Sequence, residues 1–405
     1  MTETASPPKI QETPWGFVIL LGALTACAPM SIDLYLPSQP TIGAALHASA
    51  TQLQATLAVF LAGMAVGQIV YGPMSDRFGR RPPMLAGMVI YVAASIVCAL
   101  ATSPEMLIGA RFVQALGACV GGVVSRAVVR DRFSHTETAR MLSMMMMVMG
   151  LAPILAPLLG GFLLQIAGWR SNFWLLAAFG VVVGGAAFIW LRESRSEETA
   201  IQARSEHPIQ AYISLIGKRR LMGYALAAAL NGSAMFTYVS ASPGLLIGTY
   251  GIAPSAFGWV FGLNAAGMIA GSQINRRLLR RLTPDQILSG ASITGVVLAT
   301  LLLVAALTGW GERWSVLALL FAILGSYGFT QGNAMAGALN IDPFRSGSIS
   351  ALMGSMGFAA GALASGLTGL VHDGAPKPMA VTMFLTMSSA SILLHFMALP
   401  RRAQA

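Results

Sequence analysis

The sequence consists mainly of long apolar runs, each about as long as a helix that crosses a lipid bilayer. A helix rises 1.5 Å per residue, so about 20 apolar residues span the hydrocarbon core. The runs are continuous rather than alternating, which favours helices over strands. We therefore predict an all-α integral membrane protein with about twelve transmembrane helices. The predicted spans are residues 15–37, 51–74, 84–102, 105–129, 140–167, 172–191, 220–247, 255–275, 284–308, 314–338, 347–371 and 378–399.

The composition indicates which solvent this surface faces. Charged residues make up only 10% of the chain, whereas a soluble domain carries about a quarter. We therefore expect the lipid bilayer to cover most of the surface. A net charge of +10 could indicate a nucleic-acid partner, but the basic residues lie in short clusters between apolar runs. We expect no nucleic acid, no cofactor and no metal, because Cys27, Cys98 and Cys119 lie in apolar runs without metal-ligand spacing.

One long hydrophilic segment interrupts the apolar runs, from Leu191 to Arg220. It predicts an N-terminal six-helix half at 1–191, a cytoplasmic central loop at 192–219 and a C-terminal six-helix half at 220–405. A faint repeat supports this division, because the basic loop 77–81 has a counterpart at 276–281. Several transporter folds place a central site between two such repeated halves.

The distribution of Lys and Arg predicts the orientation. With the N-terminus inside, 21 of the 25 basic residues lie in cytoplasmic segments. Only Arg170, Arg313 and Lys377 lie outside, and Arg111 falls within a span. Because basic loops stay in the cytoplasm, we expect both termini to be cytoplasmic.

The segment from Gly72 to Pro82 reads GPMSDRFGRRP and is the most specific string in the chain. It resembles the loop between spans 2 and 3 of the major facilitator superfamily. The resemblance implies a conformational loop that holds the two halves together in the outward-facing state. We expect its aspartate to lie at the positive end of a neighbouring helix, and its arginines to bind carboxylates and carbonyls. Alternatively, the loop only sets topology. Its residues are Gly72, Asp76, Arg77, Gly79, Arg80 and Arg81.

Further strings carry the resemblance over nearly the whole chain. DLYLP at 33–37 is similar to the first span of drug exporters of the bicyclomycin-resistance type (the Bcr/CflA family). RFVQALGA at 111–118 resembles the family motif R-x-x-Q-G-x-G-A, with Ala115 where glycine is usual, and 338–352 resembles that family's loop between spans 10 and 11. A set of glycines and prolines in the fifth span resembles the motif that marks antiporters. These residues are Gly150, Pro153, Pro157, Gly160 and Gly161.

Two charges, Asp33 and Arg111, lie deep inside predicted spans. A charge at the middle of a span costs roughly 2.5–3.5 kcal/mol on insertion scales, so it usually has a function. We predict that Asp33 carries protons, the alternative being a carboxylate that reaches the interface. Arg111 cannot lose its charge, and the resemblance assigns it to proton coupling and substrate-site organisation. The alternative is a structural arginine bonded to backbone carbonyls. Glu105, at the outer edge of span 4, is the next candidate for coupling.

Polar and soft side chains in the spans are candidates for a substrate cavity. The run Met141, Met144 to Met147 and Met149 suits plain packing, and also a deformable wall for varied apolar ligands. The second half supplies only weak candidates, each equally suited to interhelical packing. The predicted cavity residues are Met30, Tyr35, Gln114, Met145, Asn231, Phe236, Tyr238 and Asn264.

The resemblance implies a multidrug exporter that exchanges small amphipathic compounds for protons across a bacterial inner membrane. We expect a functional monomer and no enzyme, because the sequence has no nucleotide-binding loop and no HExxH. Alternatives within transport are an exporter of an endogenous metabolite and a nutrient uptake symporter; the span-5 motif argues against uptake. An alternative of another class is a multi-span membrane enzyme or scramblase.

Overall fold

The computed structural model describes residues 15–133, 135–195, 197, 208–342, 345–371 and 375–399. Every regular element in these residues is helical, so the predicted all-α class is confirmed. The first group of elements is α1 (Trp15–Asp33), η1 (Leu36–Ser38), α2 (Gln39–Leu46), α3 (Ala50–Phe78), α4 (Arg81–Ala99), α5 (Pro104–Arg132), α6 (His135–Ala167) and α7 (Arg170–Trp190). The second group is α9 (Pro208–Ile216), α10 (Arg219–Pro243), η2 (Gly244–Thr249), α11 (Pro254–Leu278), α12 (Pro284–Thr308), α13 (Glu312–Leu339), α14 (Ser346–Leu370), α15 (Lys377–Leu393) and η4 (Leu394–Ala398).

The predicted spans all fall on long helices, although not all of these helices are strongly apolar. Within the described residues, ten helices are long and apolar enough to cross a membrane. The remaining two predicted spans correspond to α10 and α11, which have 25 residues each. Both carry polar residues that are buried in protein, among them Asn231 and Asn264. A helix that turns polar side chains toward other helices needs less overall hydropathy than one surrounded by lipid.

The regular α-helix of the first span ends earlier than predicted, although the span as a whole runs from Trp15 to Leu46. We expected helix to continue to Pro37, but α1 ends at Asp33 and is followed by the short helices η1 and α2. Pro37 lies in the first turn of η1, and because proline has no N–H, it cannot bond to the carbonyl of Asp33, four residues earlier. The regular α-helix therefore stops at the buried aspartate.

Local sequence signals explain several helix starts. Ser49 with Gln52, and Thr283 with Gln286, form capping boxes at the N-termini of α3 and α12. Ser103 accepts a hydrogen bond from the backbone of Met106 and caps α5. These side chains satisfy backbone N–H groups that a helix cannot satisfy itself.

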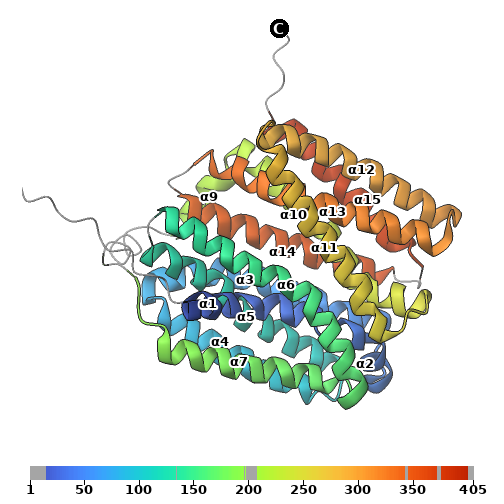
Figure 1. The fold of residues 1–405 in the computed structure, drawn as a ribbon, viewed down its shortest axis with the longest axis horizontal. Helices are drawn as coiled ribbons and strands as arrows, with labels where there is room; N and C mark the ends of the chain where they lie inside the picture. Colours follow the sequence, from blue (N-terminus) through green and yellow to red (C-terminus); the bar gives the residue numbers. More distant parts are fainter. Residues whose placement is uncertain are drawn as a thin grey trace, which may run out of the picture.

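The helices fall into two sets that lie side by side. Figure 1 shows α1 to α7 together on one side and α10 to α15 together on the other. The pair α3 and α14 makes one of the two longest junctions between the sets. Along it, Thr51 Oγ1 donates to the Gly369 carbonyl at 2.9 Å, and Ser355 Oγ donates to the Ala65 carbonyl at 3.0 Å. These two bonds lie about four helical turns apart, so the contact runs along most of both helices.

The second junction joins α6 to α11. Two glycines of α11 face large side chains of α6: Gly258 lies against Leu158, and Gly262 lies against Ile154. A side chain at Gly258 would come within 2.8 Å of the Leu158 backbone, so the helices approach as closely as glycine permits. The two sets therefore meet along two extended helix pairs.

Candidate functional site

Asp33 is buried where α1 ends, close to the second set of helices. Its side chain is 5% exposed, and it is the one buried acidic residue of the described chain. The Asp33 carboxylate lies within electrostatic range of Tyr238 in α10. The Tyr238 hydroxyl in turn accepts a hydrogen bond of 2.7 Å from Asn264 in α11. A change in the charge of Asp33 would therefore alter the electrostatic surroundings on both sides of the junction between the two sets of helices.

Arg111 is fully buried in α5. Its Nη1 donates to Gln114 Oε1 at 2.6 Å, and Gln114 Nε2 donates to Ser95 of α4 at 2.8 Å. The guanidinium lies over the rings of Tyr35 and Phe60, at 4.4 and 4.2 Å from their centroids. These faces stabilise the cation. Within the described residues, however, Nε and Nη2 have no hydrogen-bond partner.

The predicted coupling residues lie in one region without a direct bond between them. Tyr35, two residues after Asp33, contacts the Arg111 guanidinium, which places Arg111 near the end of α1. No ion pair joins Asp33 to Arg111 in the described part of the chain. The alternative was an arginine that donates to backbone carbonyls. In the described residues, Arg111 instead has one hydrogen-bond partner, the side chain of Gln114.

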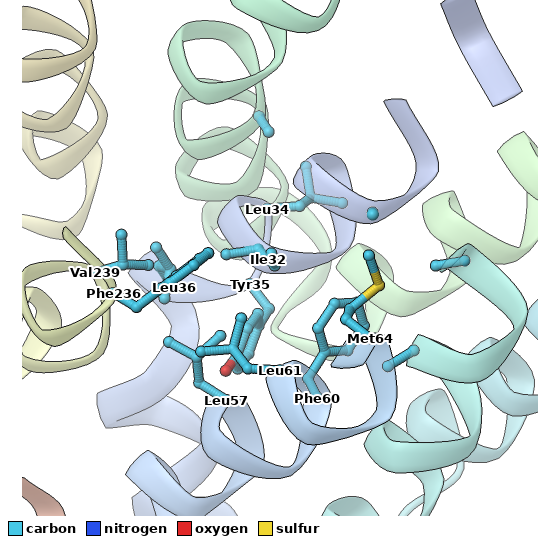
Figure 2. Close-up of a cluster of buried hydrophobic side chains, with 14 of the residues drawn as sticks. Ile32, Leu34, Tyr35, Leu36, Leu57, Phe60, Leu61, Met64, Phe236 and Val239 are labelled. Carbon is cyan, nitrogen blue, oxygen red and sulfur yellow. The ribbon is translucent and has the colours of Figure 1, made fainter. Parts of the chain in front are cut away.

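The predicted cavity residues are mostly buried, and several have ordinary packing partners. Figure 2 shows Tyr35 pointing toward Leu57 and Leu61, with Phe236 beside Leu36. The Tyr35 hydroxyl lies 3.0 Å from that of Thr56. Asn231 donates to a carbonyl of its own helix, at Ala227. Met30 is half-buried, whereas Tyr35, Gln114, Met145, Asn231, Phe236, Tyr238 and Asn264 are buried.

The structure brings some of these residues together and leaves others apart. Tyr35 and Gln114 both contact Arg111 and form one cluster with it. Tyr238 and Asn264 form a second, cross-helix pair near Asp33. Phe236 packs against Phe358 of α14, with ring centroids 5.7 Å apart. No described hydrogen bond or ring contact links Met30, Met145 or Asn231 to either group.

The methionine run has mixed surroundings. Met141 and Met145 are buried, Met144 is half-buried, and Met147 is 65% exposed. The side chains of Met146 and Met149 lie outside the described residues. An exposed methionine facing lipid and a buried one in the core both fit plain packing, so the deformable wall stays a prediction.

The antiporter-like motif of α6 lies against the backbone that follows Asp33. A Cβ at Gly160 would lie 1.8 Å from the Leu34 carbonyl oxygen, and one at Gly161 would lie 2.9 Å from the Pro254 carbonyl oxygen. The adjacent glycines therefore let α6 touch α1 and the start of α11 at once. Pro153 and Pro157 lie within the same helix, where each removes a backbone donor. Gly150 has more room, its nearest neighbour being Ile269 at 3.9 Å.

The conformational loop is held by a buried arginine. Arg80 forms an ion pair with Asp76, and its Nε lies 2.7 Å from Asp131 of α5. Its Nη1 also donates to Ser75 at 3.0 Å. Gly79 has a φ angle of +98°, at which a residue with a side chain would be strained. A Cβ at Gly72, by contrast, would meet nothing within 4 Å. Asp76, which we expected at the end of a neighbouring helix, pairs with the side chain of Arg80, the residue just before α4.

The carboxylate that lies at a helix N-terminus is Glu193, which the sequence did not single out. It accepts hydrogen bonds from the backbone N–H of Arg80 at 2.9 Å and of Arg81 at 3.1 Å, where α4 begins. Burial by itself would raise the pKa of Glu193, but these bonds and those from Ser194 and Arg195 outweigh it and lower the pKa. Glu193 therefore stays ionised and fixes the loop to the end of α7.

Arg81 of the loop, and Arg195 after α7, bind backbone carbonyls of the same set of helices. Arg81 Nη2 donates to the Phe188 carbonyl at 2.8 Å. The Arg77 carbonyl accepts a bond of 2.6 Å from Arg195, which also donates to the Asp76 carbonyl. The described hydrogen bonds of this loop thus link α3, α4, α5 and α7. The predicted contact that holds the two halves together is not among them.

Glu105, the secondary coupling candidate, lies at the surface. Its carboxylate accepts a hydrogen bond of 2.9 Å from Gln52, and its side chain is exposed. An exposed carboxylate paired with an amide is poorly placed to exchange protons with the interior. Elsewhere in the described residues, no group of three His, Cys, Asp or Glu side chains could hold a metal ion.

The sequence is similar to those of known proteins over most of its length. A family model described as Major Facilitator Superfamily matches residues 21–365. An uncharacterized MFS-type transporter of Bacillus subtilis, YdgK, is 33% identical over 91% of each chain. A bicyclomycin resistance protein homolog of Haemophilus influenzae is 30% identical over 92% of this chain and 94% of its own. The multidrug resistance protein MdtL of Shigella flexneri is 30% identical over 95% and 96%.

Solved structures share the fold at low sequence identity. The crystal structure of a D-xylose-proton symporter superposes with a TM-score of 0.74 at 11% identity, covering 95% of this chain and 98% of that one. A bacterial homolog of the human lysosomal transporter Spinster, in an inward-facing and occupied conformation, gives 0.68 at 15% identity, covering 93% and 94%. At such identities the likeness shows the fold alone.

Proposed function

The chain belongs to the major facilitator superfamily, and on that premise we propose that it exports small amphipathic drugs in exchange for protons. Two of its relatives are named for bicyclomycin resistance and for multidrug resistance, and each matches over more than nine tenths of this chain. The proposal of proton coupling rests on Asp33. It is the one buried acidic residue of the described chain and lies at the junction of the two sets of helices. We place the protein in a bacterial inner membrane and take the monomer as the functional unit.

In the proposed mechanism the halves 1–191 and 220–405 rock against each other along the α3–α14 and α6–α11 pairs. Loading Asp33 with a proton from outside neutralises a buried charge. It thereby changes the electrostatic surroundings of Tyr238, which Asn264 anchors on α11. Proton and substrate then bind to different states of the cavity, and each disfavours the other. The Arg80 cluster keeps α3, α4 and α5 together as one moving body.

The proposed substrate cavity is lined by Tyr35, Gln114 and Arg111 from the first half and by Phe236, Tyr238 and Asn264 from the second. Their support is the geometry of the two clusters around Arg111 and Tyr238. Met30, Met145 and Asn231 are proposed as outer members of this wall on the strength of the sequence alone.

Drug export is tested by expressing the chain in a bacterial host that lacks its main efflux pumps. We expect the minimal inhibitory concentration of at least some amphipathic antibiotics to rise about fourfold or more, since an exporter lowers the internal concentration at steady state. In proteoliposomes, protons that flow down an imposed pH gradient toward the cytoplasmic face of the transporter should drive the same compound in the opposite direction. Movement of compound and protons in the same direction would indicate a symporter. Turnover without any gradient would favour an enzyme or scramblase.

We further propose that both termini are cytoplasmic, on the strength of the 21 basic residues in the segments assigned to that side. Reporter fusions after Arg195 and at the C-terminus should then be active in the cytoplasm, whereas a fusion at Gly251, between η2 and α11, should be active outside. Cytoplasmic activity at Gly251 would overturn the orientation.

A further inference from the structure

Arg111 presents one edge of its guanidinium with no protein partner. Its two faces lie on the rings of Tyr35 and Phe60, and Nη1 is bonded to Gln114. The buried atoms without a partner in the described residues are Nε and Nη2. These two nitrogens form the edge that binds a carboxylate or a related oxyanion through two parallel hydrogen bonds. The aromatic rings and Gln114 therefore contact this cation, while its oxyanion-binding edge is buried without a hydrogen-bond partner.

No acidic side chain balances this charge. Asp33 is the one buried acid of the described chain and forms no ion pair there. A guanidinium cannot deprotonate, and an unpaired buried charge is unfavourable unless another charge or strong acceptors reach it. The interior is consequently positive around Arg111, and it becomes more so whenever Asp33 carries a proton.

Two further cations follow on the same helix toward its C-terminal end. Arg126 is exposed. Its Nε donates to the Gly122 carbonyl at 2.9 Å. Arg130 is exposed and lies against Gly347 at the start of α14, in the other set. Neither arginine forms an ion pair within the described residues. Cations without an acidic partner on one helix attract anions.

We propose that Arg111 binds an oxyanion of the transported compound, so that the preferred substrates are amphipathic anions bearing a carboxylate, sulfonate or phosphonate. Tyr35 and Phe60 then contact the apolar part next to that group, and Arg126 and Arg130 attract the anion on its way in. This inference rests on the proposed export function. It is consistent with the energetics of exchange, because an inside-negative membrane potential favours both the exit of an anion and the entry of a proton.

The test uses two fluorescent dyes with the same ring system, anilinonaphthalene sulfonate and the uncharged phenylnaphthylamine. Each is titrated onto purified full-length protein in a neutral detergent, with detergent alone as background. We expect Arg111→Gln to weaken sulfonate binding by at least about 10-fold and phenylnaphthylamine binding by less than about 2-fold. The matched control is Arg170→Gln, because Arg170 also lies over an aromatic ring and bonds a carbonyl, but at the start of α7. It should leave both dyes unaffected.

Arg126→Gln is a second test that does not depend on whether Arg111→Gln folds. Arg126 is exposed, so its loss leaves no buried group without a partner. It should lower sulfonate affinity about 2- to 5-fold and reduce its dependence on salt, without changing phenylnaphthylamine binding.

Several outcomes would overturn the anion site. Failure of wild-type protein to bind the sulfonate would do so, as would equal loss of both dyes in Arg111→Gln, which would make Arg111 structural or a partner of Asp33. Proton-driven export of the uncharged dye separates the two proposals. If that export persists while the sulfonate result fails, the export function stands and only the substrate class is wrong.

Discussion

Asp33→Asn is expected to abolish proton-driven efflux while the protein remains inserted and folded. Asparagine has the size of aspartate but cannot titrate, so the exchange of substrate for protons loses its carrier. Because no described ion pair depends on Asp33, its neutralisation leaves no buried cation without a partner. We expect the efflux rate under a pH gradient to fall roughly 100-fold or more, on the scale of a lost proton-transfer group. Exchange of substrate across the membrane without a gradient should survive.

Glu105→Gln is the matched control, since Glu105 is also a carboxylate near the end of a helix of the first set but is exposed and bonded to Gln52. Its efflux should equal that of wild type. Efflux in Asp33→Asn at the wild-type rate, or loss of efflux in both variants, would move the proton carrier away from Asp33.

Gly160→Ala is expected to have the second largest effect. The added methyl would lie 1.8 Å from the Leu34 carbonyl oxygen, and backbone cannot yield as a flexible side chain does. Either α6 moves away from α1, or the segment after Asp33 shifts. Overpacking of this kind costs about 1–3 kcal/mol or more, and the displacement affects the residues beside the proposed carrier. We expect lower thermal stability in detergent and at least about a 10-fold loss of transport.

Gly150→Ala tests whether the position or the residue type matters. It lies in the same helix and the same motif, but its nearest neighbour would be Ile269 at an ordinary 3.9 Å. We expect wild-type transport, with stability unchanged or slightly raised because alanine favours helix. Equal damage from both substitutions would mean that the motif glycines serve flexibility along α6 and not the contact with Leu34.

The sequence predicts the helices well because length and continuous hydropathy are local properties. It also marks Arg111 with Gln114, since a spacing of three residues places both on one helix face. The aromatic rings around Arg111 could not be predicted in the same way. Phe60 lies on α3, and nothing in the spacing of the chain indicates that it faces α5.

The loop after α3 shows the same limit. Its glycines, aspartate and arginines are legible in the sequence, and the resemblance of the string to a known loop is correct. Glu193, however, lies 113 residues beyond Arg80 and follows the last helix of the first set. Only the folded arrangement of α4 and α7 brings this carboxylate to a helix end, so its place there could not be predicted from the sequence.

The end of α1 differs from the prediction because hydropathy does not mark where this helix ends. Residues 34–37 are as apolar as the helix before them, so the predicted span continued through them. Around the proline at 37, the α-helix gives way after Asp33 to a short turn and a short 3₁₀ helix. The turn presents the Leu34 carbonyl to Gly160, which links the predicted carrier to the antiporter-like motif.

The central claim is that Asp33 exchanges its proton for substrate. The most direct measurement is proton release from purified protein in weakly buffered detergent near neutral pH, on addition of a compound to which the chain confers resistance. We predict release of about one proton per transporter in wild type, because substrate and proton binding oppose each other, and no release in Asp33→Asn. Equal release from both proteins would contradict the assignment.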